Sequence, residues 1–196
     1  MGGARRPSIA RRVRQGETDP LKRRGAFYRL LESLRKARVR FVVIGVWGAN
    51  YHAHSAGVIF TTEDRDLFLP ADPANALRAW RVCRAEGFQL WCGDEPLGEP
   101  LDRFLAEGVV SRRALVRVTG RDLLVDLTLV MAGLAFEDVW ARRRTFTVDG
   151  VKVPVASLSD IVASKAAVGR PKDQLFLATH EDALRQLLGR RFGRGD

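Results

Sequence analysis

Three aspartates in apolar surroundings are the residues of this sequence best placed to do chemistry. Asp64 and Asp66 form a D-x-D pair that runs into the apolar residues 67–69. In an extended strand, residues two apart point to the same face, so these carboxylates should stand side by side. Carboxylates that close repel each other unless a cation lies between them, and Mg²⁺ is commonly held by one or two carboxylates. Two interpretations stay open: a divalent-metal site, or an acidic surface turn before a strand.

The third aspartate, Asp126, lies among the leucines and valines of residues 123–130. An unpaired charge there would destabilise the fold by on the order of several kcal/mol, so we expect it to meet a cation, a hydrogen-bond donor or water at a cleft. Apolar residues on both faces of this segment favour a central strand and hence a site. The alternative is an edge strand with Asp126 facing solvent.

A glycine-containing segment follows the strand expected at residues 40–44. Gly45 leaves that strand and opens a helix, and Gly48 follows three residues later. Such a turn lets backbone N–H groups approach a phosphate, and a helix N-terminus favours an anion. The alternative is a tight turn without a ligand. His52 and His54, near the end of this helix, are interpreted as polar surface residues.

A lysine on an apolar helix face is the next candidate. Ser157 and Asp160 form an S-x-x-D pattern that predicts a helix start, and Lys165 shares a face with the apolar residues of that helix. Its ammonium group either extends to the rim of the core or reaches inward to a polyphosphate. The Gly-Arg-Pro-Lys-Asp sequence that follows breaks the helix and adds two cations, Arg170 and Lys172.

Helices and short strands alternate along the chain. Periodicity and capping signals predict helices at residues 25–37, 73–86, 101–107, 136–143, 157–168 and from residue 171 onward. Short apolar segments predict strands at residues 40–44, 64–69, 88–91, 115–119 and 123–130, with a hairpin formed by 145–148 and 151–155. Residues 92–100 are expected to form an irregular loop.

The net charge of +10 is concentrated at the ends of the chain. Residues 1–24 contain eight basic and two acidic side chains, and residues 190–196 contain three basic and one acidic side chain. A basic arm of this kind either binds RNA or acidic surfaces, or is a solvated disordered end. An arginine-rich, acid-poor segment is also typical of an organelle transit peptide, although serine is scarce here.

Composition limits the class of protein. A chain of 196 residues with 46% hydrophobic content is sufficient for a packed core. An apolar run of about 18 residues and a secretory signal are both lacking, so we expect no membrane association. The two cysteines, Cys83 and Cys92, are too few for a disulfide framework, which fits a cytoplasmic protein.

Four motifs in this order resemble the nucleotidyltransferase fold of the DNA polymerase β type, and more narrowly the bacterial AbiEii-like nucleotidyltransferases. They are the glycine motif of residues 45–48, the T-x-D-x-D of 62–66, the V-D-L of 125–127, and the S-K of 164–165 with the G-R-x-K-D of 169–173. The resemblance spans residues 41–180. It departs from the family where Gly45 and Gly48 replace paired small residues and where Arg65 replaces an apolar residue. Arg65 is expected to pair with an acidic group or to lie at a subunit boundary.

The resemblance implies an α/β (α+β) fold with a mixed, largely antiparallel sheet flanked by helices. It also implies a basic arm (1–24), a nucleotidyltransferase core (25–156) and C-terminal helices packed on the core (157–196). Asp64, Asp66 and Asp126 would bind two Mg²⁺ ions, with Asp126 also a candidate general base. The residues that would contact the NTP are Gly45, Gly48, Thr62, Lys165, Arg170 and Lys172.

The implied activity is metal-dependent transfer of a nucleoside monophosphate (NMP) from an NTP to an acceptor hydroxyl or phosphate. Because the AbiEii-like group includes toxins, a transfer RNA or other RNA acceptor and an antitoxin partner are expected. Two alternatives stay open. One is a small-molecule acceptor, as in aminoglycoside-modifying relatives, and the other is a non-catalytic module that binds nucleic acid or protein on the same fold.

Overall fold

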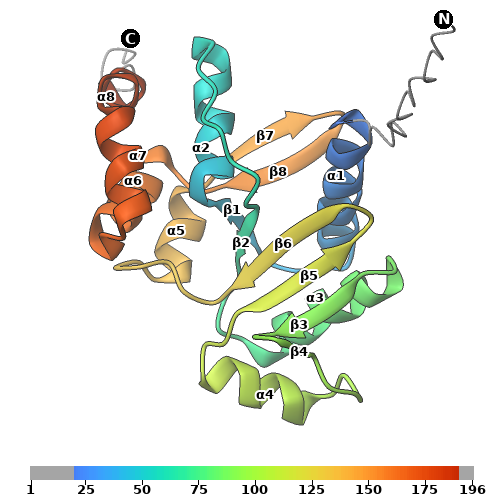
Figure 1. Cartoon of the computed structure of the whole chain (residues 1–196). Helices are drawn as coiled ribbons and strands as arrows, with labels where there is room; N and C mark the ends of the chain where they lie inside the picture. The colour runs from blue at the N-terminus through green and yellow to red at the C-terminus, as the bar shows by residue number, and fades with distance from the viewer. Residues whose placement is uncertain (1–19, 190–196) are drawn as a thin grey trace, which may run out of the picture.

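A mixed sheet of eight short strands forms the centre of the protein (Figure 1). The structure is a computed structural model, and it describes residues 20–189. Across the sheet the strands follow the order β4-β3-β5-β6-β2-β1-β8-β7. Their bounds are β1 (Val42–Ile44), β2 (Asp66–Phe68), β3 (Gln89–Cys92), β4 (Glu95–Pro96), β5 (Val116–Gly120), β6 (Leu123–Thr128), β7 (Arg144–Val148) and β8 (Val151–Val155).

Helices pack on both faces of this sheet. They are α1 (Pro20–Lys36), α2 (Gly45–Ala53), α3 (Pro73–Ala85), α4 (Arg103–Ser111), α5 (Phe136–Arg142), α6 (Leu158–Val168), α7 (Pro171–Thr179) and α8 (Glu181–Gly189), with a 3₁₀ turn η1 (His54–Ala56). Residues 20–24, which were expected to belong to the basic arm, are part of α1. The rest of that arm and residues 190–196 lie outside the described residues.

The strand pairing confirms a mixed, largely antiparallel sheet. The parallel pairs are β1 with β8 and β2 with β6. The other pairs are antiparallel, and they include the predicted β7–β8 hairpin. Asp149 and Gly150 adopt positive φ angles of 50° and 77° in its two-residue turn, as a type I′ turn requires.

Alternating residues of the central strands build two separate cores. On one face, Val43, Leu67 and Val125 pack with α1 and α3 in a core that also contains Phe27 and Trp80. On the other face, the buried side chains include Val42, Phe68, Ala49, Val139 and Ile161, which come from β1, β2, α2, α5 and α6. The second core covers β1 and β2 and stops at β6.

Side-chain caps determine where three helices begin. Asp72 accepts a hydrogen bond from the N–H of Ala74 ahead of α3, and Ser157 accepts one from Asp160 ahead of α6. Asp102 caps α4 in the same way. This cap starts α4 at Arg103 and the helix continues to Ser111, beyond the expected end at residue 107.

One segment is more regular than its composition indicated. Residues 92–100 were expected to be irregular, but Glu95–Pro96 forms the edge strand β4 and pairs with β3. A proline is tolerated there because an edge strand has one side without ladder hydrogen bonds. None of the helices within residues 20–189 is long and apolar enough to cross a membrane.

Candidate active site

Asp66 and Asp126 lie directly opposite each other on the neighbouring parallel strands β2 and β6. Both belong to the face of the sheet that carries Phe68, so both lie where the second apolar core ends. The pairing continues one residue before β2, where the N–H of Asp126 donates to the carbonyl oxygen of Arg65 at 2.8 Å. Asp126 is therefore in a central strand, as predicted, and its carboxylate lies beside that of Asp66.

Asp64 lies just before β2, in an exposed position. Burial of Asp66 and the negative charges of Asp126 and Asp64 raise the pKa of the Asp66 carboxyl to about 6. The positive charges of Lys165 and Lys172 act in the opposite direction. The three carboxylates predicted to act together are thus close enough to influence one another, with two of the predicted cations within electrostatic range.

Gly45 makes room for the Asp66 carboxylate. It has φ of +67°, which side chains other than glycine rarely adopt, and a Cβ atom there would lie 2.5 Å from Asp66 Oδ2. The turn between β1 and α2 therefore brings bare backbone against a carboxylate. The predicted turn at the start of a helix is present, and Asp66 is its immediate neighbour.

Gly48 has a different environment. It is buried in α2, and a Cβ atom there would lie 3.1 Å from both the Val43 carbonyl oxygen and Ile161 Cδ1. The missing side chain at this position allows α2 to pack closely against β1 and α6. The contact with phosphate that was predicted for Gly48 stays a prediction.

Arg117 is the site residue that motif reasoning missed. Its Nε and Nη2 donate hydrogen bonds to Asp126 Oδ1 and Oδ2 at 2.8 and 3.0 Å. The signal was present in the sequence, because a hairpin with Arg121 and Asp122 as its two-residue turn places positions 117 and 126 opposite each other. The hydrogen bonds and charge of Asp126 raise the pKa of Arg117.

Lys165 is neither at the rim of the core nor in open solvent. Its side chain is 15% exposed, and its Nζ lies 2.6 Å from Oδ1 of Asp173, whose side chain is 8% exposed. The ammonium group also lies 5.0 Å from the centre of the Phe176 ring. The structure therefore shows a third arrangement, an ion pair between α6 and α7, in addition to the two that were considered.

The remaining predicted contacts lie around Asp64. Lys172 Nζ is 3.8 Å from Asp64 Oδ2, and both side chains are exposed. Thr62 Oγ1 accepts a hydrogen bond from the N–H of Asp64 at 3.2 Å. Arg170 is exposed at the N-cap position of α7. The structure thus brings Lys172 and Thr62 to the carboxylates, and it puts Arg170 at the start of the helix that carries Lys172.

Arg65 points to the face opposite the carboxylates, as the D-x-D pattern predicts. Its guanidinium carbon lies 4.2 Å from the centre of the Trp47 ring and 5.6 Å from that of Phe27. A planar guanidinium group over aromatic rings explains how a charged residue is accommodated where an apolar one is usual. The expected acidic partner or subunit boundary stays a prediction.

The two histidines near the end of α2 lie in different environments. His54 is exposed, as expected. His52 is half-buried, with its Nε2 2.8 Å from the Ala156 carbonyl oxygen and its ring against the edge of Phe146. The interpretation of His52 as a surface residue was wrong, because its ring links α2 to the segment that follows β8.

The carboxylates fit a divalent cation in their chemistry. Burial, and then the negative charges of Asp126 and Asp64, raise the pKa of Asp66, and hard oxygen ligands are what Mg²⁺ prefers. Within residues 20–189, no three acidic, histidine or cysteine side chains are arranged as a metal-binding cluster. At this site Arg117 binds both oxygens of Asp126.

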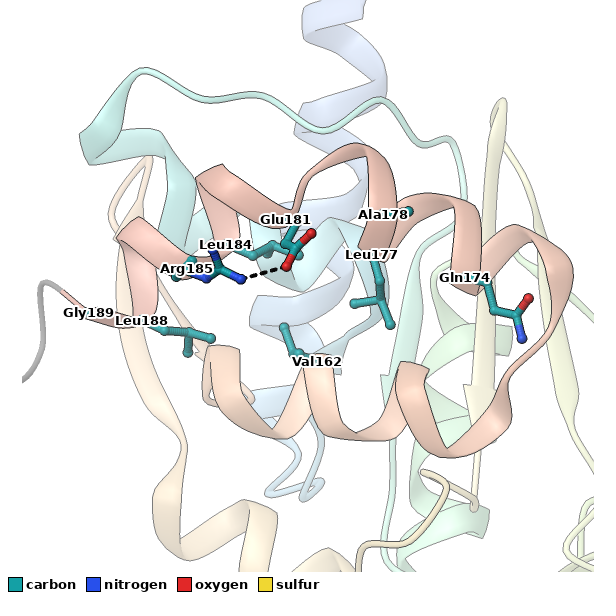
Figure 2. A pocket seen from close by; sticks show the side chains of 9 residues that line it. All are labelled: Val162, Gln174, Leu177, Ala178, Glu181, Leu184, Arg185, Leu188 and Gly189. Atoms are coloured by element: carbon teal, nitrogen blue, oxygen red, sulfur yellow. Dashed lines mark hydrogen bonds and ion pairs between the residues drawn. The ribbon is translucent and has the colours of Figure 1, made fainter.

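A groove of about 740 Å³ lies apart from these residues, between α6, α7 and α8 (Figure 2). Its lining includes Val162, Leu177, Leu184 and Leu188, and the Glu181–Arg185 ion pair closes one side at 2.6 Å. None of the predicted site residues lines it. The groove therefore belongs to the C-terminal helices and not to the carboxylate site.

Comparison of the sequence with protein-family models and with curated proteins gave no match. The structure, in contrast, resembles solved structures. A Thermotoga maritima protein assigned as a nucleotidyltransferase aligns with a TM-score of 0.51 and 14% identity, covering 81% of this chain and 92% of that one. The antibiotic-resistance factor ANT(2'')-Ia aligns with a TM-score of 0.49 and 14% identity, over 86% and 91% of the two chains.

A second structure of ANT(2'')-Ia, in complex with adenylyl-2''-tobramycin, aligns with a TM-score of 0.48 and 13% identity, over 86% of this chain and 98% of that one. At such identities a structural likeness defines an architecture and leaves the activity open. The alignment with the Thermotoga maritima protein and the arrangement of strands and helices described above agree. This chain has the nucleotidyltransferase fold.

Proposed function

We propose that this protein is a nucleotidyltransferase that moves a nucleoside monophosphate from an NTP to a hydroxyl or phosphate of an acceptor. The observation that carries the proposal is the register of β2 and β6, which puts Asp66 opposite Asp126 while Asp64 precedes β2. Three mutually repelling carboxylates beside a glycine turn are an unfavourable arrangement without a cation. Such an arrangement is explained by a metal-binding role.

In this proposal Asp64, Asp66 and Asp126 hold Mg²⁺, with two ions expected from the family resemblance. Bound Mg²⁺ supplies neutralisation of the charge that develops on the transferring phosphoryl group and on the leaving group. Lys172, Arg170 and Thr62 contact the triphosphate, and Lys165 positions α7 through Asp173. The backbone at Gly45 lies close enough to Asp66 to contribute an N–H group at the same place.

The reaction balances as a displacement at the α-phosphorus of the NTP. An oxygen of the acceptor forms a bond to that phosphorus, the bond to the bridging oxygen breaks, and pyrophosphate leaves. The acceptor proton passes to a carboxylate or to water, and Asp126 is the candidate base in this chain. The predicted antitoxin partner stays a prediction.

A second candidate function is a non-catalytic binding module on the same fold. One observation favours it: the Arg117 guanidinium group already binds both oxygens of Asp126, in the place that a metal ion would take. If that pair persists in the presence of NTP and Mg²⁺, the third carboxylate is not available. The two candidates therefore differ in a measurable property, the binding of Mg²⁺.

The test uses the full chain with Mg²⁺ and each of the four NTPs labelled at the α-phosphate, with total RNA or with small hydroxyl-bearing acceptors. Asp66→Asn and Asp126→Asn are compared with Asp94→Asn, which changes an exposed acid in the turn between β3 and β4. Label transfer by the wild type and by Asp94→Asn, but by neither site variant, is the expected result. If calorimetry shows that the wild type binds no NTP in the presence of Mg²⁺ and it labels no acceptor, the catalytic proposal fails.

A further inference from the structure

One half of the sheet has an uncovered face beside the carboxylates. Helices α1 and α3 pack behind β3, β5 and β6, and in the part of the chain that the structure describes no helix lies over their front face (Figure 1). Leu124 is accordingly 38% exposed although it lies in a central strand. This open face begins where the second apolar core ends, at Asp66 and Asp126.

A register row crosses the open face and ends in the candidate active site. Pro96 pairs with Trp91, Trp91 with Arg117, Arg117 with Asp126, and Asp126 with Asp66. Partners in register point to the same side of a sheet. Two strand spacings, about 10 Å, separate the β3 strand that carries Trp91 from the β6 strand that carries Asp126.

Trp91 is the unusual member of this row. Trp47, Trp80 and Trp140 belong to the two apolar cores, whereas Trp91 belongs to neither core of the described residues. Its indole is half-buried, and its Nε1 donates a hydrogen bond to Thr119 Oγ1 at 3.1 Å. A ring held in this way by its polar edge leaves apolar surface available to another flat group.

The strands β3, β5 and β6 direct no net charge to the open face. Asp126 is the only carboxylate that β3, β5 and β6 direct to this side, and Arg117 neutralises it. The other side chains on the face are aromatic, apolar, amide or hydroxyl groups: Trp91, Leu124, Gln89, Thr119 and Thr128. A ligand with flat rings and hydrogen-bonding edges matches this surface.

We infer that the open face of β3, β5 and β6 binds the acceptor of the proposed reaction, and that this acceptor is a single-stranded nucleic acid end. This inference rests on the proposed function. A base stacks on Trp91, Arg117 lies between that base and the carboxylates, and the terminal hydroxyl reaches Asp66 and Asp126 along the register row. Aromatic stacking with nearby cations is how proteins bind single strands without strong sequence preference.

The probe is a fluorescein-labelled single-stranded RNA of about 12 nucleotides, which is within the size range of single-strand sites. Fluorescence anisotropy measures its binding to the full chain at about 0.2 M salt, where contacts made only with phosphates are weakened. Trp91→Ala removes the stacking surface, and Trp91→Phe retains it. Phe104→Ala is the matched control, because Phe104 lies on α4 outside the row and is 85% exposed.

We expect Trp91→Ala to weaken RNA binding by about tenfold or more, which corresponds to about 1.4 kcal/mol or more. Trp91→Phe should recover most of the affinity, and Phe104→Ala should bind as the wild type does. Equal RNA affinity for the wild type and Trp91→Ala overturns the inference. So does saturable binding of tobramycin by a wild type that binds no RNA.

Binding of NTP in the presence of Mg²⁺, measured on the same variants, separates the two proposals. If Trp91→Ala binds the nucleotide as the wild type does but binds RNA more weakly, the result supports both the proposed function and the acceptor inference. Nucleotide binding without RNA binding leaves the proposed function standing and overturns the acceptor inference. RNA binding that depends on Trp91, without any nucleotide binding, overturns the proposed function and leaves this face as a single-strand binding surface.

Discussion

Arg117 donates one hydrogen bond to each carboxylate oxygen of Asp126, at 2.8 and 3.0 Å, from the neighbouring strand of a hairpin. The Arg117 side chain is 47% exposed, while that of Asp126 is 15% exposed. The guanidinium group thus neutralises a carboxylate that the proposed function assigns to Mg²⁺. The two cations should compete for the same oxygens.

Arg117→Met tests this competition. Without Mg²⁺ we expect the free energy of unfolding to fall by about 1 kcal/mol, because a bidentate but half-exposed ion pair is lost. Mg²⁺ should then raise the melting temperature of Arg117→Met more than that of the wild type. The reason is that Asp126 of the variant has lost its cation, and the metal ion relieves the repulsion between Asp126 and Asp66. Thermal melts with and without MgCl₂ measure both effects.

Arg103→Met is the control for this change. Arg103 forms an exposed ion pair with Glu107 within α4, so its loss should hardly change the stability of the fold. Its response to Mg²⁺ should equal that of the wild type. If Mg²⁺ stabilises Arg117→Met no more than it stabilises the wild type, the guanidinium group does not compete with the metal.

Asp66→Asn should stabilise the metal-free protein at neutral pH. The folded-state pKa of Asp66, about 6, lies above the ordinary value of 3.8. As pH rises from about 4 to about 6, the unfolded chain loses this proton before the folded protein does, so ionisation of Asp66 destabilises the fold across that window. At pH 7 we expect the variant to gain roughly 2 kcal/mol, and the gain should disappear below about pH 4.

Urea denaturation at pH 4, 5, 6 and 7, in the presence of a chelator, measures this gain. Asp94→Asn is the matched change at an exposed position and should stay within about 0.5 kcal/mol of the wild type. If the stability difference between Asp66→Asn and the wild type does not change with pH, the pKa of the Asp66 carboxyl is not raised in the folded protein.

Gly45→Ala should lower the free energy of unfolding by more than the positive φ angle alone explains. A Cβ atom at Gly45 would lie 2.5 Å from Asp66 Oδ2, and φ there is +67°. Gly57 has φ of +70° with nothing within 4 Å of the added carbon, so Gly57→Ala measures the backbone cost alone, about 1–2 kcal/mol. The clash should add about 1–3 kcal/mol for Gly45→Ala.

Denaturation of both variants gives the difference, and NTP binding should be lost only in Gly45→Ala, because the displaced Asp66 no longer faces Asp126. Equal stabilities for the two variants would mean that the Asp66 side chain moves away without penalty. In that case close contact between the turn and the carboxylate would not matter for the fold.

Lys165 should contribute far more to stability than Lys172, because its ion pair is buried and that of Lys172 is exposed. Lys165→Met leaves the buried Asp173 without its partner, so we expect a loss of about 3 kcal/mol in the free energy of unfolding. Replacing both partners, as in the double variant Lys165→Met with Asp173→Leu, should restore most of this loss. Lys172 is 69% exposed, so Lys172→Met should change stability by less than about 0.5 kcal/mol.

Calorimetric titration with NTP and Mg²⁺ completes the comparison of the two lysines. Lys172→Met should weaken nucleotide binding while the fold stays intact, since Lys172 lies beside Asp64 at the candidate site. A Lys165→Met protein that is as stable as the wild type but binds no NTP would reverse the assignment and make Lys165 the ligand contact.

The local signals in the sequence predicted most elements because each depends on neighbouring residues. Asp72 and Ser157 cap the helices they were expected to cap, and Asp149-Gly150 forms the expected turn. The short β4 strand was missed because pairing of Glu95–Pro96 with β3 depends on where the chain returns and not on strand propensity. The half-buried position of His52 was missed because its partner, Ala156, is distant in sequence.

The sequence by itself determined the candidate carboxylates, because a D-x-D before an apolar strand and an aspartate within another are unusual enough to identify from residue types and spacing. Only the tertiary structure decided that β2 and β6 are parallel neighbours with Asp66 opposite Asp126. It also decided that Arg117 binds Asp126 and that Lys165 pairs with Asp173. Contacts between strands and helices depend on register and packing, and these arise from the whole set of buried side chains and not from a local motif.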